Sequence, residues 1–133
     1  LDVEETIDIH LSEIPSTIGD SFPTSLAKFG VKGYKITYGT IYENKPIRSQ
    51  ALLLMPENTN DICLVAYFHG TILPLKLFDS DRKIPSKYDG GATEWREVRW
   101  CGVSLATSGY TVLLPDYIGY GTTADKEHPF VYY

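Results

Sequence analysis

Near its middle the chain contains the run Ile62-Cys63-Leu64-Val65-Ala66-Tyr67-Phe68-His69-Gly70-Thr71. From Ile62 to Phe68 the residues are apolar at even and odd positions alike, which predicts a short strand with both faces covered. A histidine and a glycine follow that strand directly. Strands covered on both faces are typical of sheets flanked by helices, so this run favours an α/β fold.

The next two predicted elements complete a unit of the same kind. Residues 94–108 are predicted to form a helix, with Thr93 as N-cap and Gly109 as the residue that ends it. The apolar face of this helix consists of Trp95, Val98, Cys101, Leu105 and Ala106. A second apolar strand is predicted over residues 110–115. Strand, helix and strand in this order predict a crossover between two parallel strands.

The chain before residue 62 predicts an antiparallel hairpin. Residues 34–42 alternate between apolar and polar side chains, residues 43–46 form a turn cluster, and residues 47–55 resume the extended pattern. The predicted fold class is therefore α/β, with a mixed sheet in which an antiparallel hairpin precedes a parallel β-α-β unit. Residues 1–30 are interpreted as an N-terminal extension, with a short helix within residues 23–29. Residues 31–133 are expected to hold the first four strands and the first helix.

Composition excludes several classes of function. The chain has 133 residues, 43% of them hydrophobic and 22% charged, as expected for one globular domain. Its net charge is -5 and its basic residues are scattered, so no nucleic-acid partner is expected. No apolar run is long enough for a transmembrane segment. The chain begins at Leu1 without a leader, which favours an exported protein whose leader was removed, or a trimmed chain.

Neither a metal site nor a cofactor is predicted. Cys63 and Cys101 are interpreted as small buried apolar residues, and a disulfide between them is the alternative if the helix packs on that strand. Asp79 and Asp81 lack the remaining positions of a calcium loop. The histidines, which lie far apart without the spacing of metal ligands, are His10, His69 and His128.

The residues His69 and Gly70 stand at the carboxyl end of a predicted strand, the edge at which α/β sheets bind ligands. Gly70 permits a sharp turn, after which the amide of Thr71, or alternatively of Ile72, can point into the crevice. Acyl transfer needs such a donor, because negative charge develops on the carbonyl oxygen in the transition state. The alternative is that His69 only forms a hydrogen bond within its own loop.

The second predicted strand also ends in a distinctive sequence, Asp116-Tyr117-Ile118-Gly119-Tyr120-Gly121. If the two strands are parallel neighbours, both ends lie on the same edge of the sheet. The pattern Gly119-x-Gly121-x-x-Ala124 also fits a loose dinucleotide-binding turn. Its context argues against that interpretation, because two residues separate the strand from the glycines and residues 125–129 do not predict a helix N-terminus.

Taken in order, the motifs resemble the first half of bacterial and fungal α/β-hydrolases of the secretory-lipase and esterase type. The motifs, which follow the hairpin, are His69-Gly70-Thr71, Ile84-Pro85-Ser86, Ala106-Thr107-Ser108-Gly109-Tyr110, Asp116-Tyr117-x-Gly119-x-Gly121 and His128-Pro129-Phe130. The resemblance implies that Thr71 supplies an oxyanion-hole amide, with its hydroxyl as a second donor and Ile72 as the alternative amide. The residues that it implies shape the site are His69, Gly70, Asp116, Tyr117, Gly119 and Gly121, so Asp116 is not expected to be the triad acid.

The catalytic serine of this family has no counterpart in the chain. The family's nucleophile lies in a Gly-x-Ser-x-Gly turn, and that pentapeptide is absent. His128 precedes any such serine, which breaks the family's triad order, so it is interpreted as a loop residue. The serines that lack the paired glycine flanks and the strand-turn-helix setting of such a nucleophile are Ser80, Ser86, Ser104 and Ser108. The expectation is therefore the N-terminal portion of a serine carboxylic-ester hydrolase for an apolar ester substrate, truncated before its nucleophile and inactive alone.

The resemblance also implies partners. In this family the third strand pairs outward with a strand that follows the nucleophile, so the strand from Ile62 to Phe68 would present an unpaired edge. Its expected partner is the remainder of the same hydrolase domain, or a second copy of the chain through that edge. The alternative function is a non-catalytic interaction module that docks a partner through residues 74–83.

Overall fold

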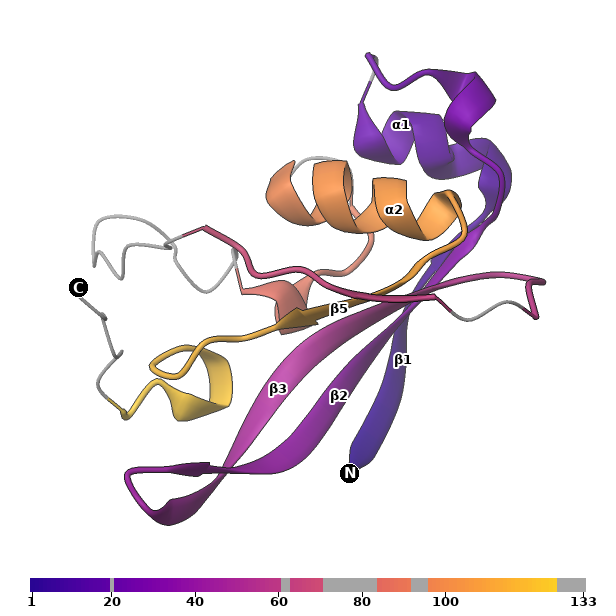
Figure 1. Ribbon diagram of the computed structural model, residues 1–133. Helices are drawn as coiled ribbons and strands as arrows, with labels where there is room; N and C mark the ends of the chain where they lie inside the picture. Colours follow the sequence, from indigo (N-terminus) through magenta and orange to yellow (C-terminus); the bar gives the residue numbers. More distant parts are fainter. Residues whose placement is uncertain (20, 61–62, 71–83, 92–95, 127–133) are drawn as a thin grey trace.

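The computed structural model describes residues 1–19, 21–60, 63–70, 84–91 and 96–126. Within these parts one sheet has the strand order β1-β2-β3-β5-β4 (Figure 1). Its strands are β1 (Asp2–Ile9), β2 (Val31–Tyr42), β3 (Lys45–Pro56), β4 (Leu64–Ala66) and β5 (Thr111–Pro115). The pairs β1–β2, β2–β3 and β3–β5 are antiparallel, and β4 and β5 are parallel. The predicted α/β class and mixed sheet are confirmed.

The hairpin of β2 and β3 is confirmed, with a tighter turn than the sequence predicts. Tyr42 pairs with Lys45, so the loop is only Glu43 and Asn44, with φ angles of 50° and 60°. Two positive φ angles are the geometry of a primed two-residue turn, whose twist matches that of the flanking strands. Lys45 and Pro46 therefore belong to β3 and not to the turn.

Residues 1–30 form a strand that the sequence pattern did not predict. β1 pairs with β2 along its length, but the register shifts between Glu5 and Ile7. This bulge changes which face each side chain occupies, because side chains alternate strictly along a strand. Val3 is therefore 59% exposed, whereas Ile7 is only 3% exposed and lies opposite Gly33.

The rest of this N-terminal region is helical in part and belongs to the core. Its short elements are η1 (Leu11–Glu13), α1 (Ile14–Ile18) and η2 (Thr24–Leu26), of which η2 takes the place of the helix expected within residues 23–29. Ile14 and Ile18 are fully buried. The region is thus integrated with the sheet and is not an extension, although in the sequence its apolar residues are isolated among acidic ones.

The predicted helix is confirmed over its described residues. It includes a π-helical segment, η5 (Val98–Val103), which leads into α2 (Ser104–Thr107), and it ends at Gly109 with φ 109°. The expected N-cap Thr93 lies outside the described residues. Gly102 faces the sheet, where an added Cβ would lie 3.0 Å from Leu54 Cδ1. The absence of a side chain there lets the helix pack closely on β3.

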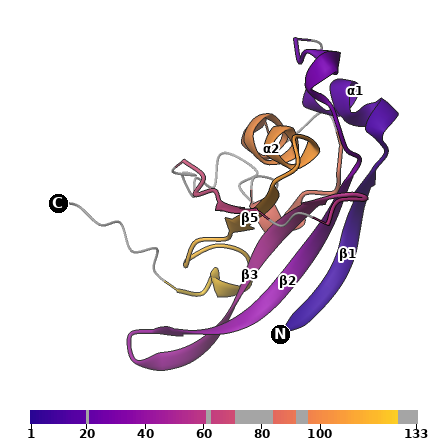
Figure 2. The same cartoon turned by 45° about the vertical axis from the view of Figure 1, so that its right-hand side comes forward.

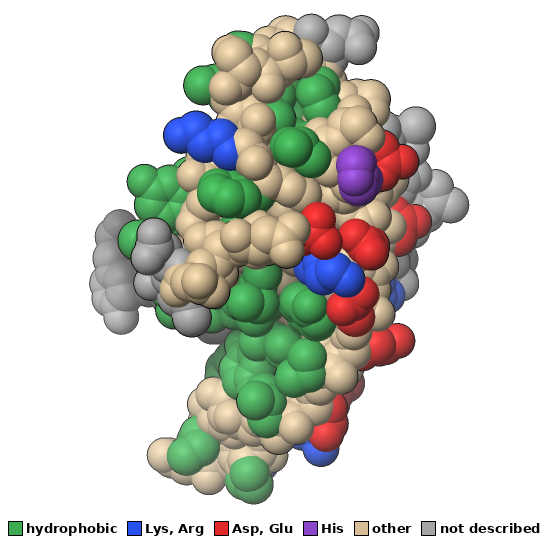
Figure 3. All heavy atoms as spheres, turned by 90° about the vertical axis from the view of Figure 1, so that its right-hand side faces the viewer, with side chains coloured by type: hydrophobic (Ala, Val, Ile, Leu, Met, Phe, Trp, Pro, Cys, Tyr) green, Lys and Arg blue, Asp and Glu red, His purple; other side chains and the backbone are tan. Residues whose placement is uncertain are grey.

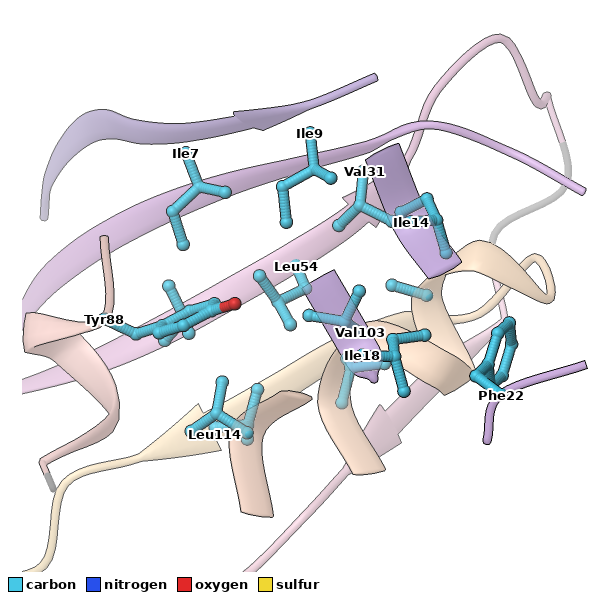
Figure 4. Packing of buried hydrophobic residues seen from close by; sticks show 14 residues of the cluster. Ile7, Ile9, Ile14, Ile18, Phe22, Val31, Leu54, Tyr88, Val103 and Leu114 are labelled. Atoms are coloured by element: carbon cyan, nitrogen blue, oxygen red, sulfur yellow. The ribbon is translucent and has the colours of Figure 1, made fainter. Parts of the chain in front are cut away.

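One face of the sheet carries the core. The helices α1 and α2 lie on the same side of the strands (Figures 1 and 2). Side chains of β1, β3 and β5 point toward these helices and toward Tyr88 (Figure 4). Tyr88, only 1% exposed, follows the short 3-10 helix η4 (Pro85–Lys87) and fills the space beside Leu114. The segment after residue 83 therefore contributes to the core through Tyr88.

β4 is the last strand of the sheet, and it is more exposed than predicted. Leu64 is 62% and Phe68 66% exposed, so the prediction that both faces of this strand are covered is wrong for the chain as it stands. Cys63 is exposed and Cys101 is half-buried, and both are free thiols. The interpretation of Cys63 as buried, and the alternative of a disulfide, are therefore also wrong. These side chains are exposed because β4 lies at the edge of the described sheet, where a strand has a neighbour on one side only.

The opposite face of the sheet is apolar and only half-buried. Its residues alternate with the core positions, and they include Tyr34, Ile36, Leu53 and Leu113. Seen from the β1 side, hydrophobic side chains gather beside a row of acidic ones (Figure 3). On β1 the carboxylates of Glu5 and Asp8 pair with Lys32 at 3.1 and 3.5 Å. Among the described residues, none of the helices has the length and apolar character to cross a membrane.

Candidate functional site

The ends of β4 and β5 lie side by side, as expected for parallel neighbours. Ala66 pairs with Leu113, and the Tyr67 N–H donates to Leu113 O at 2.8 Å. Just beyond, the rings of His69 and Tyr117 are stacked, with centroids 4.0 Å apart and planes at 23°. The Tyr117 hydroxyl also donates to His69 O at 2.7 Å. The two chain segments that leave the sheet are thus joined to each other.

The side chain of His69 is held within its own loop. It is 6% exposed, and its Nδ1 lies 2.7 Å from Gly70 O. Since a carbonyl oxygen only accepts, Nδ1 carries the hydrogen of this bond. With one ring face on Tyr117, this imidazole is a local structural group. That is the alternative weighed from the sequence, and it leaves the backbone of this segment as the candidate for chemistry.

Glu97, at the start of the described part of the helix, contacts the same segment. Its Oε1 accepts from the Gly70 N–H at 3.2 Å and from the Tyr67 hydroxyl at 3.3 Å. The Gly70 N–H is therefore already bonded. Burial, followed by the charge of Glu97, raises the pKa of Tyr117 above its ordinary value, which keeps that phenol protonated as a donor. In the sequence Glu97 is only an acidic residue early in a helix, so no signal singled it out.

Asp116 is a buried carboxylate with two donors from one residue. It is 5% exposed, and it accepts from the Ser86 N–H at 3.0 Å and from the Ser86 Oγ at 2.5 Å. Burial raises the pKa of Asp116 to about 6, although the hydrogen bonds from Ser86 and the charge of Lys87 oppose that rise. Its own N–H donates to Gln50 O, which fixes the backbone at the end of β5. Asp116 therefore ties η4 to the sheet.

The two glycines after Asp116 fold the chain back over this carboxylate. Gly119 and Gly121 have φ angles of 91° and 55°, a region that favours glycine. A Cβ on Gly121 would lie 3.0 Å from Asp116 Oδ2. The chain then enters η6 (Gly121–Thr123), a single 3-10 turn. A pyrophosphate is bound at the N-terminus of a full helix, so this geometry does not fit a dinucleotide-binding turn.

The adjacent residues Asp116 and Tyr117 hold both ends of the segment between Gly70 and Ile84. Tyr117 bonds His69 at its start, and Asp116 bonds Ser86 at its end. Thr71 and Ile72, predicted as amide donors, lie inside that segment and outside the described residues. Ser86, which lacks the glycine flanks of a nucleophile, instead holds the end of this segment through its two hydrogen bonds to Asp116. Within the described parts of the chain, no group of acidic, histidine or cysteine side chains could hold a metal ion.

Two solved structures match the fold of this chain. One, named "putative hydrolase", is from Legionella pneumophila, with a TM-score of 0.66 and 18% identity over 91% of this chain. The other is the rice cell wall degrading esterase LipA from Xanthomonas oryzae, with a TM-score of 0.59 and 21% identity over 91% of this chain. The chain has a hydrolase-like fold. It spans 31% and 29% of those two proteins. No family model and no curated protein matches the sequence.

Proposed function

We propose that this chain is the N-terminal portion of a serine carboxylic-ester hydrolase and that it supplies the oxyanion-hole loop. The observation that carries the proposal is the attachment of both ends of the segment containing Thr71 to Asp116 and Tyr117. The described residues at its two ends, His69 and Ser86, are bonded to the chain just after β5, at the carboxyl edge where α/β sheets act on ligands. The hydrolase-like fold adds support.

The chemistry assigned to the loop is charge stabilisation. When a serine attacks an ester carbonyl, negative charge develops on the carbonyl oxygen, and a preorganised N–H lowers the barrier by about 3–4 kcal/mol. The donor is the amide of Thr71, with the amide of Ile72 as the alternative and the Thr71 hydroxyl as a second donor. The chain has no Gly-x-Ser-x-Gly sequence, so the proposal places the nucleophile elsewhere in the protein and expects no ester hydrolysis by these residues alone.

The exposed edge of the sheet at β4 supports the proposal that further protein completes this sheet. β4 leaves one side of its backbone unpaired by any described strand, beside the exposed side chains of Leu64 and Phe68. An edge of this kind pairs readily with another strand. The matched structures are also about three times longer than this chain. We assign this edge to the remainder of the same hydrolase domain, and expect self-association through it when that remainder is missing.

Labelling with a fluorophosphonate tests the assignment in the whole protein. One serine outside residues 1–133 is expected to react, and the chain alone is expected to remain unlabelled. Nitrophenyl esters of increasing acyl length then define the substrate. A label on Ser86 or on another serine of this chain, or no label at all, would contradict the proposal. The last outcome favours the alternative of an interaction module, whose docking residues 74–83 lie outside the described part.

The donor itself is tested by a pair of variants at one position. Thr71→Pro removes the amide hydrogen, and kcat is expected to fall by about 10²- to 10³-fold. Thr71→Ala keeps that amide and removes only the hydroxyl, so its loss is expected to be much smaller. If both variants lose activity equally, the hydroxyl and not the amide is the donor. If neither does, the amide of Ile72 is to be tested in the same way.

A further inference from the structure

A single peptide group at the end of β4 is held by side chains at both of its polar ends. The carbonyl of His69 and the N–H of Gly70 belong to the same peptide bond. Tyr117 donates to the carbonyl oxygen at 2.7 Å, and Glu97 accepts from the N–H at 3.2 Å. These two side chains come from different elements, since Tyr117 follows β5 and Glu97 lies at the start of the described part of the helix.

Two bonds of this kind fix the orientation of the peptide plane. The group is planar, and in a trans peptide its oxygen and hydrogen point in opposite directions. Rotating the plane would break one bond or the other. The constraint matters at this position because Gly70 has no Cβ, so steric repulsion alone restricts its backbone less than that of other residue types.

The two side chains are themselves located by further contacts. The ring of Tyr117 stacks on the ring of His69, and the carboxylate of Glu97 also accepts from the Tyr67 hydroxyl. The residue after Glu97 is Val98, which is 2% exposed and packs in the core. Both ends of the peptide are therefore held by groups that the sheet and the core already place.

We propose that Glu97 and Tyr117 form a peptide clamp that fixes the peptide plane through which the chain enters Gly70, and so positions the start of the loop to which the proposed function assigns the oxyanion-hole amide. This inference rests on the proposed function. In it Glu97 and Tyr117 are positioning residues that act through the backbone, without contact with the substrate. The substitution of either one is expected to lower kcat and to leave KM nearly unchanged.

The clamp is tested first by amide hydrogen exchange at Gly70, which requires no activity. Exchange is expected to be at least about tenfold faster in Glu97→Ala, because the acceptor is lost. Glu97→Gln keeps an oxygen acceptor, so its exchange should stay within about threefold of the unchanged protein. Glu4→Ala, which removes an exposed glutamate on β1, is the matched control. Equal exchange at Gly70 in all four proteins would overturn the clamp.

Kinetics of the whole hydrolase provide the second test. Glu97→Ala and Tyr117→Phe should each lower kcat by about 10- to 100-fold, the cost of a misplaced catalytic group, with KM within about twofold. Glu97→Gln should retain activity. Because both bonds act on one peptide, the double variant should lose less than the product of the single losses.

The outcomes separate the two proposals. If the unchanged protein is labelled by a fluorophosphonate and both single variants keep their kcat, the clamp is wrong and the hydrolase assignment stands. If Glu97→Ala and Tyr117→Phe both lower kcat and Glu97→Gln retains it, the clamp is supported. If the unchanged protein is not labelled, the hydrolase assignment fails and the role given to the clamp fails with it.

Discussion

Replacing Asp116 with asparagine should change how the stability of the protein depends on pH. Burial raises the pKa of this carboxyl in the folded protein to about 6, from the ordinary value of 3.8. One pKa unit corresponds to about 1.4 kcal/mol, so the gap represents about 3 kcal/mol. Since the folded pKa is the higher one, this contribution to stability is present below the unfolded pKa and is lost as the pH rises through about 6.

Asparagine fits the same position without ionising. Its side-chain oxygen can accept from the Ser86 N–H, and its amide can donate to the Ser86 Oγ. We therefore expect the free energy of unfolding of Asp116→Asn, relative to that of the unchanged protein, to increase by about 2–3 kcal/mol between pH 4 and pH 8. Urea unfolding at half-unit steps of pH measures this difference, and the carboxyl ¹³C shift of Asp116 gives its pKa directly.

The control is Asp125→Asn, which removes an exposed carboxyl beside Lys126. The hydrogen bond from Lys126 lowers the pKa of Asp125, so any dependence on pH should be small and of opposite sign. A difference between Asp116→Asn and the unchanged protein that stays flat from pH 4 to pH 8, or that falls, would refute the reasoning. It would mean that the hydrogen bonds from Ser86 outweigh the cost of burying the charge.

Three further substitutions test the fold and the edge. Gly33→Ala should lower the free energy of unfolding by about 1–3 kcal/mol, because the added Cβ would lie 2.6 Å from the side chain of Ile7 on β1. Gly39→Ala on the same strand is the control, because its Cβ would meet nothing within 4 Å. Ser86→Ala should raise the pKa of Asp116 further and destabilise the protein by about 1 kcal/mol more at pH 8 than at pH 4, as urea unfolding would show. Leu64→Lys should make the isolated chain more monomeric in light scattering, and an unchanged mass would contradict pairing through β4.

Local patterns predicted most of the sheet correctly. The hairpin, the helix and the second parallel strand follow from alternation, apolar periodicity and a terminal glycine, which are properties of neighbouring residues. β1 was not predicted, because its isolated apolar residues stand among acidic ones, and the bulge between Glu5 and Ile7 then places Val3 and Ile7 on opposite faces of the sheet. A single sequence carries no sign of that shift, which depends on pairing with β2.

The candidate site was predicted in part. The motifs at His69 and Asp116 identified the two chain segments that leave the sheet, and the structure places those segments side by side. The roles of Glu97 and Ser86 could not be predicted, because each bonds a residue 27 to 30 positions away in the sequence. Nothing in the sequence around either residue indicates that partner.

The amino-acid sequence by itself determined the hairpin, the helix and the two parallel strands and the order in which they follow one another, since these depend on interactions between residues close together in the chain. Only the tertiary structure decided which strand lies at the edge, which carboxylate is buried and which side chains hold the peptide after β4. Those features depend on distant segments meeting. Leu64 shows the difference, because its apolar side chain predicts burial and its place at the end of the sheet leaves it 62% exposed.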